Sequence, residues 1–363
     1  MTKKKTGGKT LGEFKEKHDP HAVIKKLEAE LRKALEQSAD AAAIKDAVGT
    51  ISMHLDELGE PPPWTYEESG KASSVGVPTL FLSDFHWGEV VHPSQIGGVN
   101  QFNMAIARKR LKYTVETAIK LLSIVDPKLE YPGIVVPLGG DMVSGNIHEE
   151  LQATNELNIM PTVLDLYDNL VSAIKLLADT FGNVFLPCVS GNHGRNTRRM
   201  WAKDRHHTSF DWLLYQFLAK HFMDDDRIVF YVPDGSDAPF KIYNTRYNMT
   251  HGDQFRGGDS IIGPIGPLTR GNQKKLARDQ GIGRGYDILI CGHFHQYIQL
   301  RRLIVNGSLK GYDEYAASNN YGFEEPAQAM WITHPRHGIT FRMPCYSEQA
   351  KKGAKLPPWV TAS

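Results

Sequence analysis

Residues 79–86 read Thr-Leu-Phe-Leu-Ser-Asp-Phe-His, a short apolar run that ends directly in an aspartate and a histidine. Four later apolar runs end in the same way, each in a turn that holds a glycine and a side chain able to bind a metal. These turns are Gly139-Gly140-Asp141, Gly191-Asn192-His193, His251-Gly252-Asp253 and Gly292-His293-Phe294-His295. Apolar runs bounded by such turns predict buried strands. Because ligands of open α/β sheets collect beyond the strand ends, we expect the five turns to meet at one place.

The rest of the chain from residue 78 to 345 alternates such runs with longer helical patterns, which predicts one α/β domain. The expected strands are 79–82, 134–138, 184–189, 246–250 and 287–291, and the expected main helices are 102–125, 161–180 and 209–221. The stretch 254–286 contains eight glycines and no clear apolar period, so we expect a long mobile loop there.

The first 77 residues have a different character. Residues 1–19 are basic and predict no regular structure, whereas apolar positions at helical spacing predict a helical hairpin over 20–60. Prolines, glycines and serines over 61–77 predict a linker, and 346–363 is expected to be a C-terminal tail. For the hairpin we expect an interaction role, such as a homo-oligomer formed through these helices.

Composition limits the class of protein. The 363 residues are 41% hydrophobic and 23% charged, with a mean hydropathy of −0.37 and a net charge of +1, which is typical of a globular protein without membrane partners. No apolar run follows the Lys-rich start, so a cytoplasmic location is the expectation. Three cysteines at 188, 291 and 345 are too far apart for a CxxC metal site, and we expect buried thiols.

The donors in the five turns are imidazoles, carboxylates and one amide oxygen, without thiolates. This set suits Mn, Fe, Zn or Mg, and Mn is the expected metal. Its size fits two divalent ions, for which Asp141 is the natural bridging carboxylate. Such a pair lowers the pKa of a bound water towards about 7, which supplies a nucleophile for phosphate esters. His193 is expected to protonate the leaving oxygen or to bind the phosphoryl group, and His148 is a weak candidate for a supporting contact.

The order of these turns resembles the signature of the calcineurin-like metallophosphoesterases: DxH, GD, GNH, a lone His and GHxH, here over residues 79–345. The resemblance implies a double β-sandwich flanked by helices. It also implies that Asp84, His86 and His295 bind one metal, that Asn192, His251 and His293 bind the other, and that Asp141 bridges them. Two positions depart from the family pattern. Gly194 stands where an acidic residue often supports the preceding histidine, and Ser144 stands where many members have aspartate.

The substrate class is inferred from motif detail and nearby charge. The stretch 140–146 lacks the GDxVDRG pattern of protein phosphatases, whereas Asp84-Phe85-His86-Trp87-Gly88 is similar to the first motif of SbcD-type repair exonucleases. Basic residues beside the site, Arg195 and Arg198 among them, would suit a phosphodiester backbone. The prediction is therefore a two-metal phosphodiesterase that acts on DNA or RNA. The alternatives are a phosphomonoesterase for phosphoproteins or small nucleotides, and a scaffold protein with a structural metal site.

Overall fold

The computed structural model describes residues 61–67, 75–256 and 263–349. The strands are β1 Val77–Leu80, β2 Ile134–Val135, β3 Val184–Pro187, β4 Ile228–Tyr231, β5 Asp237–Ile242, β6 Thr245–Thr250, β7 Ile288–Cys291, β8 Ile298–Leu300, β9 Leu303–Val305, β10 Ala327–His334 and β11 Gly338–Tyr346. The α-helices are α4 Met104–Val125, α5 Glu149–Thr154, α6 Ile159–Phe181, α7 Phe210–His221, α8 Ile265–Gly281 and α9 Glu314–Ser318. Short 3-10 helices, η1 to η3, span Pro63–Thr65, Pro93–Gln95 and His206–Thr208.

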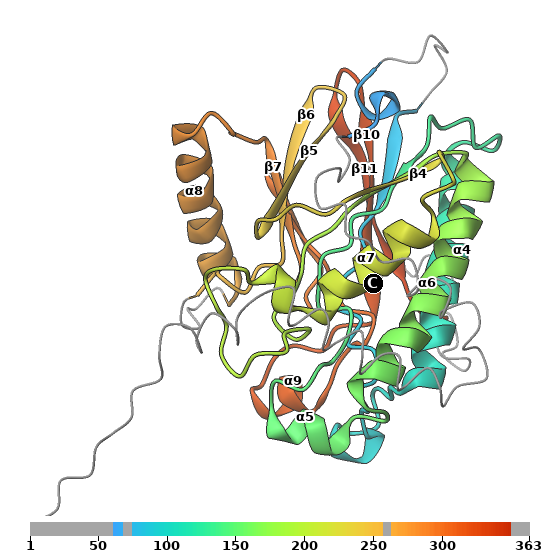
Figure 1. The fold of residues 1–363 in the computed structure, drawn as a ribbon. Coiled ribbons are helices and arrows are strands. Elements are labelled where there is room, and N and C mark those ends of the chain that lie inside the picture. The colour runs from blue at the N-terminus through green and yellow to red at the C-terminus, as the bar shows by residue number, and fades with distance from the viewer. Residues whose placement is uncertain (1–60, 68–74, 257–262, 350–363) are drawn as a thin grey trace, which may run out of the picture.

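The strands form two sheets that face each other (Figure 1). The first has the order β11-β10-β1-β2-β3-β4, in which β1 to β4 run parallel, and the second has the order β5-β6-β7-β9-β8. Parallel pairs β6–β7 and β7–β9 form the centre of the second sheet. Helices α4, α6 and α7 cover the outer face of the first sheet, and α8 lies against the second (Figure 1). The α/β double β-sandwich flanked by helices is therefore confirmed.

Alternation along each strand explains the layers, since successive side chains in a strand point to opposite faces. In the first sheet, Leu80 packs towards the helices and Phe81 packs between the sheets. In the second sheet, Ile290 packs between the sheets, whereas Leu289 and Cys291 pack towards α8. The central strands β1, β2, β3, β7 and β9 are buried on both faces, which is why they appear in the sequence within continuous apolar runs.

The expected loop over 254–286 is wrong for residues 265–281, which form α8. Its buried stripe consists of Leu268, Asn272, Lys275 and Asp279. This spacing is helical, but three of the four side chains are polar, so hydrophobic periodicity does not reveal it. Gly271 is required by packing, because a Cβ there would stand 2.2 Å from Phe255 Cδ1.

The packed domain extends slightly beyond both expected boundaries. Thr65, in the expected linker, is buried and its carbonyl accepts the N–H of Tyr243 at 2.7 Å. At the other end, Ser347 is buried and Glu348 forms an ion pair with Arg110 at 2.8 Å. The hairpin over 20–60, the stretch 1–19 and the last part of the tail lie outside the described residues. Within the described part of the chain, no helix is both long and apolar enough to cross a membrane.

Candidate metal centre

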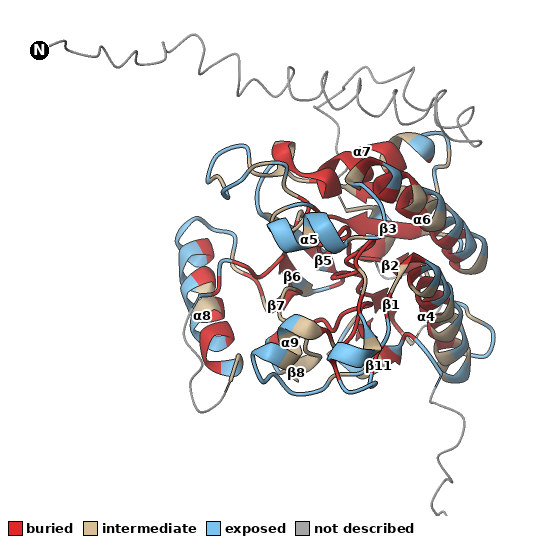
Figure 2. Cartoon of the chain, turned by 90° about the horizontal axis from the view of Figure 1, so that it is seen from below, coloured by how far each residue is buried: buried red, intermediate tan, exposed pale blue. Residues whose placement is uncertain are grey.

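The five turns singled out in the sequence meet at one end of the two sheets. Their metal-binding side chains form three overlapping groups in which the candidate ligand atoms lie within 4.8 Å of one another: Asp84, His86 and His295; His86, Asp141 and His193; and Asp141, His251 and His293. The groups share His86 and Asp141, so they form one continuous cluster. Figure 2 looks towards this end of the molecule, where α5 and α9 lie.

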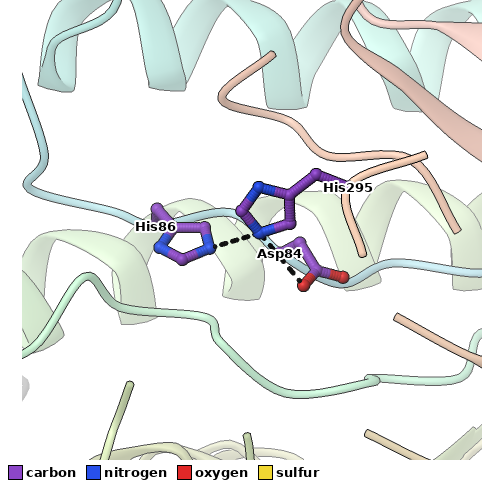
Figure 3. Close-up of side chains that lie close together, drawn as sticks. All are labelled: Asp84, His86 and His295. Carbon is purple, nitrogen blue, oxygen red and sulfur yellow. Dashed lines mark hydrogen bonds and ion pairs between the residues drawn. The ribbon is translucent and has the colours of Figure 1, made fainter. Parts of the chain in front are cut away.

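The first group joins the turn after β1 to the turn after β7. His86 Nε2 lies 2.9 Å from His295 Nε2, which in turn lies 3.6 Å from Asp84 Oδ1 (Figure 3). Asp84 and His86 are fully buried. Burial is the main reason why the pKa of the Asp84 carboxyl is raised, to about 6. Burial, followed by the charge of His86, holds the pKa of His295 well below its usual range.

The second group centres on Asp141. Its Oδ2 lies 3.0 Å from His251 Nε2, and that nitrogen is also 3.1 Å from Asn192 Oδ1. The His293 ring lies 5.2 Å from the His251 ring. Burial acts to raise the pKa of Asp141, but the charges of His251 and His193 outweigh it and hold that pKa well below the usual range. All seven predicted ligands are thus brought together, with Asp141 between the two ligand sets.

His193 lies beside the two residues that the groups share, His86 and Asp141, with its ring 4.6 Å from that of His86. Its backbone N–H donates to Asp141 Oδ1 at 2.7 Å, and its Nδ1 is 2.9 Å from the carbonyl oxygen of Ser144. Since a carbonyl oxygen can only accept, Nδ1 carries the hydrogen and Nε2 is the free ring nitrogen. Ser144 therefore supplies, through its backbone, the orientation that an acid at position 194 would provide. The His148 ring is 6.3 Å from that of His193.

The backbone of these turns is unusual. Nine non-glycine residues in the described part of the chain have positive φ angles, and five are predicted ligands: Asp84, His86, Asp141, His293 and His295. Such conformations are costly for residues with a Cβ and collect at functional sites. Glycines allow the turns to approach closely. A Cβ on Gly191 would stand 2.0 Å from Asp141 Oδ1, and one on Gly292 would stand 2.1 Å from Asp84 Oδ2.

The donor arrangement fits bound cations. His251 Nδ1 is 2.9 Å from the Gly139 carbonyl oxygen and so carries a hydrogen, which leaves Nε2 facing two oxygen acceptors. Asp141 Oδ2 is buried, and apart from its ion pair with His251 Nε2 it has no hydrogen-bond partner among the described residues. Burial is the largest influence and lowers the pKa of His251, but Asp141, Asp84 and Asp253 together outweigh it and raise that pKa to about 10, so a proton occupies Nε2 in the absence of another cation. A divalent ion would replace that proton and satisfy the same atoms.

Three residues that the sequence patterns did not single out support His86. Its Nδ1 lies 3.3 Å from Glu89 Oε2, and Glu89 Oε1 accepts a hydrogen bond from Lys310 Nζ at 2.8 Å. Lys310 also pairs with Asp313. Burial opposes ionisation of Glu89, but the Lys310 charge holds its pKa below the usual range. A carboxylate behind a histidine typically orients a metal ligand. The i,i+3 spacing of His86 and Glu89 is the only trace of this contact in the sequence.

Asp211, at the start of α7, is a second residue that the patterns missed. Its buried carboxylate accepts the backbone N–H groups of Asp141, Met142 and Gly191 at 3.0, 3.2 and 2.9 Å. It also explains Gly194, since a Cβ at that position would stand 2.8 Å from Asp211 Oδ1. Burial, followed by the charge of Asp141, raises the pKa of Asp211 to about 6.

The basic residues near the centre fall into two sets. Arg198 and Arg199 are exposed, and Arg195 donates to the carbonyl of Asn192 at 2.7 Å, beside a predicted ligand. By contrast, Arg205 pairs with Asp253 at 2.9 Å, and Lys275 and Arg278 both pair with Asp237. The charges of Lys275 and Arg278 are therefore largely neutralised by internal carboxylates.

No protein-family model matches the sequence, and no curated protein matches it. Among solved structures, the chain is similar to Vps29 from Entamoeba histolytica complexed with Zn²⁺, at 13% identity and a TM-score of 0.30 over 74% of this chain and 99% of that one. A predicted phosphoesterase from Streptococcus pneumoniae TIGR4 has 11% identity and a TM-score of 0.28 over 75% of this chain and 99% of that one. Sulfate thiohydrolase SoxB from Thermus thermophilus has 10% identity and a TM-score of 0.31 over 75% of this chain and 57% of that one. By the order of its motifs and the fold that carries them, the chain resembles the calcineurin-like metallophosphoesterases.

Proposed function

We propose that the protein is a metal-dependent phosphoesterase that hydrolyses phosphodiester bonds, with DNA or RNA as its substrate. The observation that carries this proposal is the convergence of seven predicted ligands on buried strand ends, with a further imidazole, that of His193, beside them. A purely structural ion would need only one closed set of ligands. Two sets that share Asp141 and include partly exposed histidines favour a reaction centre.

In this proposal, Asp84, His86 and His295 hold one divalent ion, Asn192, His251 and His293 hold the other, and Asp141 contacts both. Manganese is the proposed metal, and Fe, Zn and Mg are compatible with the same nitrogen and oxygen donors. When bound, the ions supply the Lewis acidity that activates a water and offsets the charge of the phosphate group.

His193 is the proposed auxiliary catalytic residue. With Nδ1 donating to the Ser144 carbonyl, its Nε2 remains available to bind a phosphoryl oxygen or to pass a proton to the leaving oxygen. The neighbouring turns hold the backbone of this residue, since its main-chain N–H donates to Asp141 Oδ1 and a Cβ on Gly145 would stand 1.9 Å from its carbonyl oxygen, and the Nδ1–Ser144 contact orients the ring. This fixed position supports a role in orientation.

The nucleic-acid part of the proposal rests on Arg195, Arg198 and Arg199. They follow the Asn192-His193 turn directly, and the latter two extend into solvent. Phosphate contacts from such residues dominate nucleic-acid affinity and make it depend on salt.

The test uses purified protein supplied with Mn²⁺ and three substrates: bis-p-nitrophenyl phosphate, p-nitrophenyl phosphate and single-stranded DNA. We expect hydrolysis of the diester and of DNA, and its loss in Asp141→Ala. Unchanged activity in that variant would refute the proposal. Preference for the monoester would favour a phosphomonoesterase. Fewer than one ion per chain by mass spectrometry, with no hydrolysis, would favour a scaffold.

A second comparison isolates the substrate. The double substitution Arg198→Ala/Arg199→Ala should weaken binding of single-stranded DNA and reduce the salt dependence by about 0.7 in log–log slope for each lost phosphate contact. Hydrolysis of bis-p-nitrophenyl phosphate should not change. The matched control is Lys109→Ala/Lys120→Ala, which removes two exposed charges from α4. Equal effects of both pairs would argue against a nucleic-acid contact at residues 198 and 199.

A further inference from the structure

A separate group of metal-binding side chains lies outside the candidate centre. It consists of His206 and His207 in the short helix η3 and Asp234 in the connection between β4 and β5. Their candidate ligand atoms lie within 4.8 Å of one another. The two imidazole rings are 4.5 Å apart, and His207 Nε2 is 3.8 Å from Asp234 Oδ1.

The imidazole of His207 is poorly satisfied. Both of its ring nitrogens are buried, and neither has a hydrogen-bond partner among the described residues. The nearest carboxylate oxygens are Asp234 Oδ1, 3.8 Å from Nε2, and Asp204 Oδ1, 3.9 Å from Nδ1, and both are too far away for hydrogen bonds. Buried polar atoms without partners are rare in native proteins and commonly mark the place of a water or an ion.

Packing holds the His207 ring in place for such a ligand. The Trp212 ring lies 5.1 Å away at an interplanar angle of 78°, and the His206 ring flanks it at 71°. The Asp234 side chain is 79% exposed and can therefore move towards the two rings.

We propose that His206, His207 and Asp234 form a third cation site, which binds a Zn²⁺-like divalent transition metal apart from the two-metal centre. Two imidazoles and one carboxylate, without a thiolate, are ligands that Zn²⁺ accepts, and a water would complete four-coordination. Mg²⁺ and Ca²⁺ are disfavoured because they prefer oxygen ligands.

The position of this site gives it a structural role. Arg205 precedes the two histidines and pairs with Asp253, which lies two residues after His251. Residues 195 and 209 pair as an isolated bridge, and they enclose the basic segment 195–208. An ion at the third site would tie the end of this segment to the β4–β5 connection. It would thereby position Arg205 and the arginines beside the centre without touching the reacting atoms.

The test counts metal ions in the full-length protein without an affinity tag. Wild type, His206→Asn/His207→Asn and Asp234→Asn are stripped with chelator, equilibrated with Zn²⁺, passed through gel filtration and analysed by mass spectrometry. The matched control is His334→Asn/His337→Asn, which removes another neighbouring histidine pair, with rings 4.8 Å apart, in the β10–β11 hairpin. We expect both site variants to hold one ion fewer than wild type and than the control.

Equal ion counts in wild type and the site variants would overturn the proposal, as would an equal loss in the control. Thermal unfolding provides a second measurement. Zn²⁺ should raise the melting temperature of wild type and the control more than that of Asp234→Asn, an exposed substitution that should leave the fold intact. Equal shifts in all three proteins would also refute the site. All the compared proteins keep the residues of the two-metal centre, so differences in ion count or melting temperature report on the third site alone. The result is therefore valid whether or not the protein hydrolyses phosphodiesters.

Discussion

The buried carboxylate of Asp211 accepts the backbone N–H of Asp141 at 3.0 Å. The two residues are 70 positions apart, yet one sets the place of the other. Because the same carboxylate also accepts the N–H of Gly191, the turns that carry Asp141 and Asn192 are held at a common point. The candidate centre therefore depends on a helix residue that contacts it only through the backbone.

Replacing Asp211 by alanine should strongly destabilise the protein. Three buried N–H groups would lose their acceptor, and each unsatisfied group costs about 1–3 kcal/mol. Urea unfolding should show a loss of at least ~3 kcal/mol in the free energy of unfolding. Asp226→Ala, at an exposed position, is the control. If the two variants are equally stable, Asp211 does not organise these turns.

Gly194→Ala tests the close approach between that residue and Asp211. The new Cβ would stand 2.8 Å from Asp211 Oδ1 and would displace the carboxylate from the turns that it holds. We expect a loss of about 1–3 kcal/mol in thermal unfolding, as for other overpacked sites. Gly281→Ala provides the comparison, because no atom lies within 4 Å of its added Cβ. A neutral effect at residue 194 would contradict the proposed contact.

Glu89→Gln should weaken metal binding without removing a ligand. The substitution keeps the shape of the side chain but removes the charge that faces His86 Nδ1 and pairs with Lys310. Loss of such a supporting carboxylate typically costs 10–100-fold, roughly, in metal affinity. Titration of the metal-free protein with Mn²⁺, after removal of bound metal by a chelator, measures the affinity, and circular dichroism checks the fold. Unchanged affinity would show that Glu89 serves only to neutralise Lys310.

His193→Gln should separate catalysis from metal binding. Glutamine removes the ring nitrogen proposed to meet the phosphate or the leaving group, and a group that transfers protons or binds the transition state contributes about 10²–10⁴-fold in rate. The metal content measured by mass spectrometry should equal that of wild type. A parallel loss of metal and activity would instead identify His193 as a ligand.

The ion pair between Lys275 and Asp237 should give a pH-dependent contribution to stability. Burial opposes ionisation of Asp237, but Lys275 and Arg278 outweigh it and lower its pKa. A carboxyl whose pKa is lower in the folded than in the unfolded protein stabilises the folded state at pH values above its unfolded pKa, which is near 4 for aspartate. This stabilisation is lost as the pH falls below that value towards the folded-state pKa. At pH 7, Asp237→Asn should cost about 3–5 kcal/mol because Lys275 stays buried without its partner.

Urea unfolding at pH 7, 5 and 3.5 tests this expectation. The difference between wild type and Asp237→Asn should be similar at the two higher values and smaller at pH 3.5. The control is Lys175→Ala, which removes an exposed ion pair with Asp179 on α6. This substitution should change the free energy of unfolding only slightly at every pH. A pH-independent difference would contradict the assigned charge interaction.

Local sequence predicted the three main helices and the strands β1, β2, β3, β6 and β7, and it singled out the side chains that meet at the candidate centre, but it did not predict β4, β5 or β8 to β11. Apolar runs that end in glycine and a ligand side chain, as at residues 79–86 and 287–295, are short-range patterns with a direct physical meaning. Helix α8 was not predicted from hydrophobic periodicity because its buried face carries Asn272, Lys275 and Asp279, whose partners lie elsewhere in the chain.

Only the tertiary structure decided how the centre is supported. Asp211 holds the backbone of the predicted ligand Asp141, Lys310 pairs with Glu89 behind the predicted ligand His86, and the carbonyl oxygen of Ser144 orients His193. Folding makes all three contacts, and a backbone carbonyl has no sequence signature at all. The same holds for the basic residues. In the sequence, Arg205, Lys275 and Arg278 are basic residues close to the motifs, just as Arg198 and Arg199 are. In the folded protein the first three pair with carboxylates, whereas Arg198 and Arg199 are exposed to solvent. Residue type is a local property, whereas the neutralisation of a charge depends on which side chain the fold places beside it.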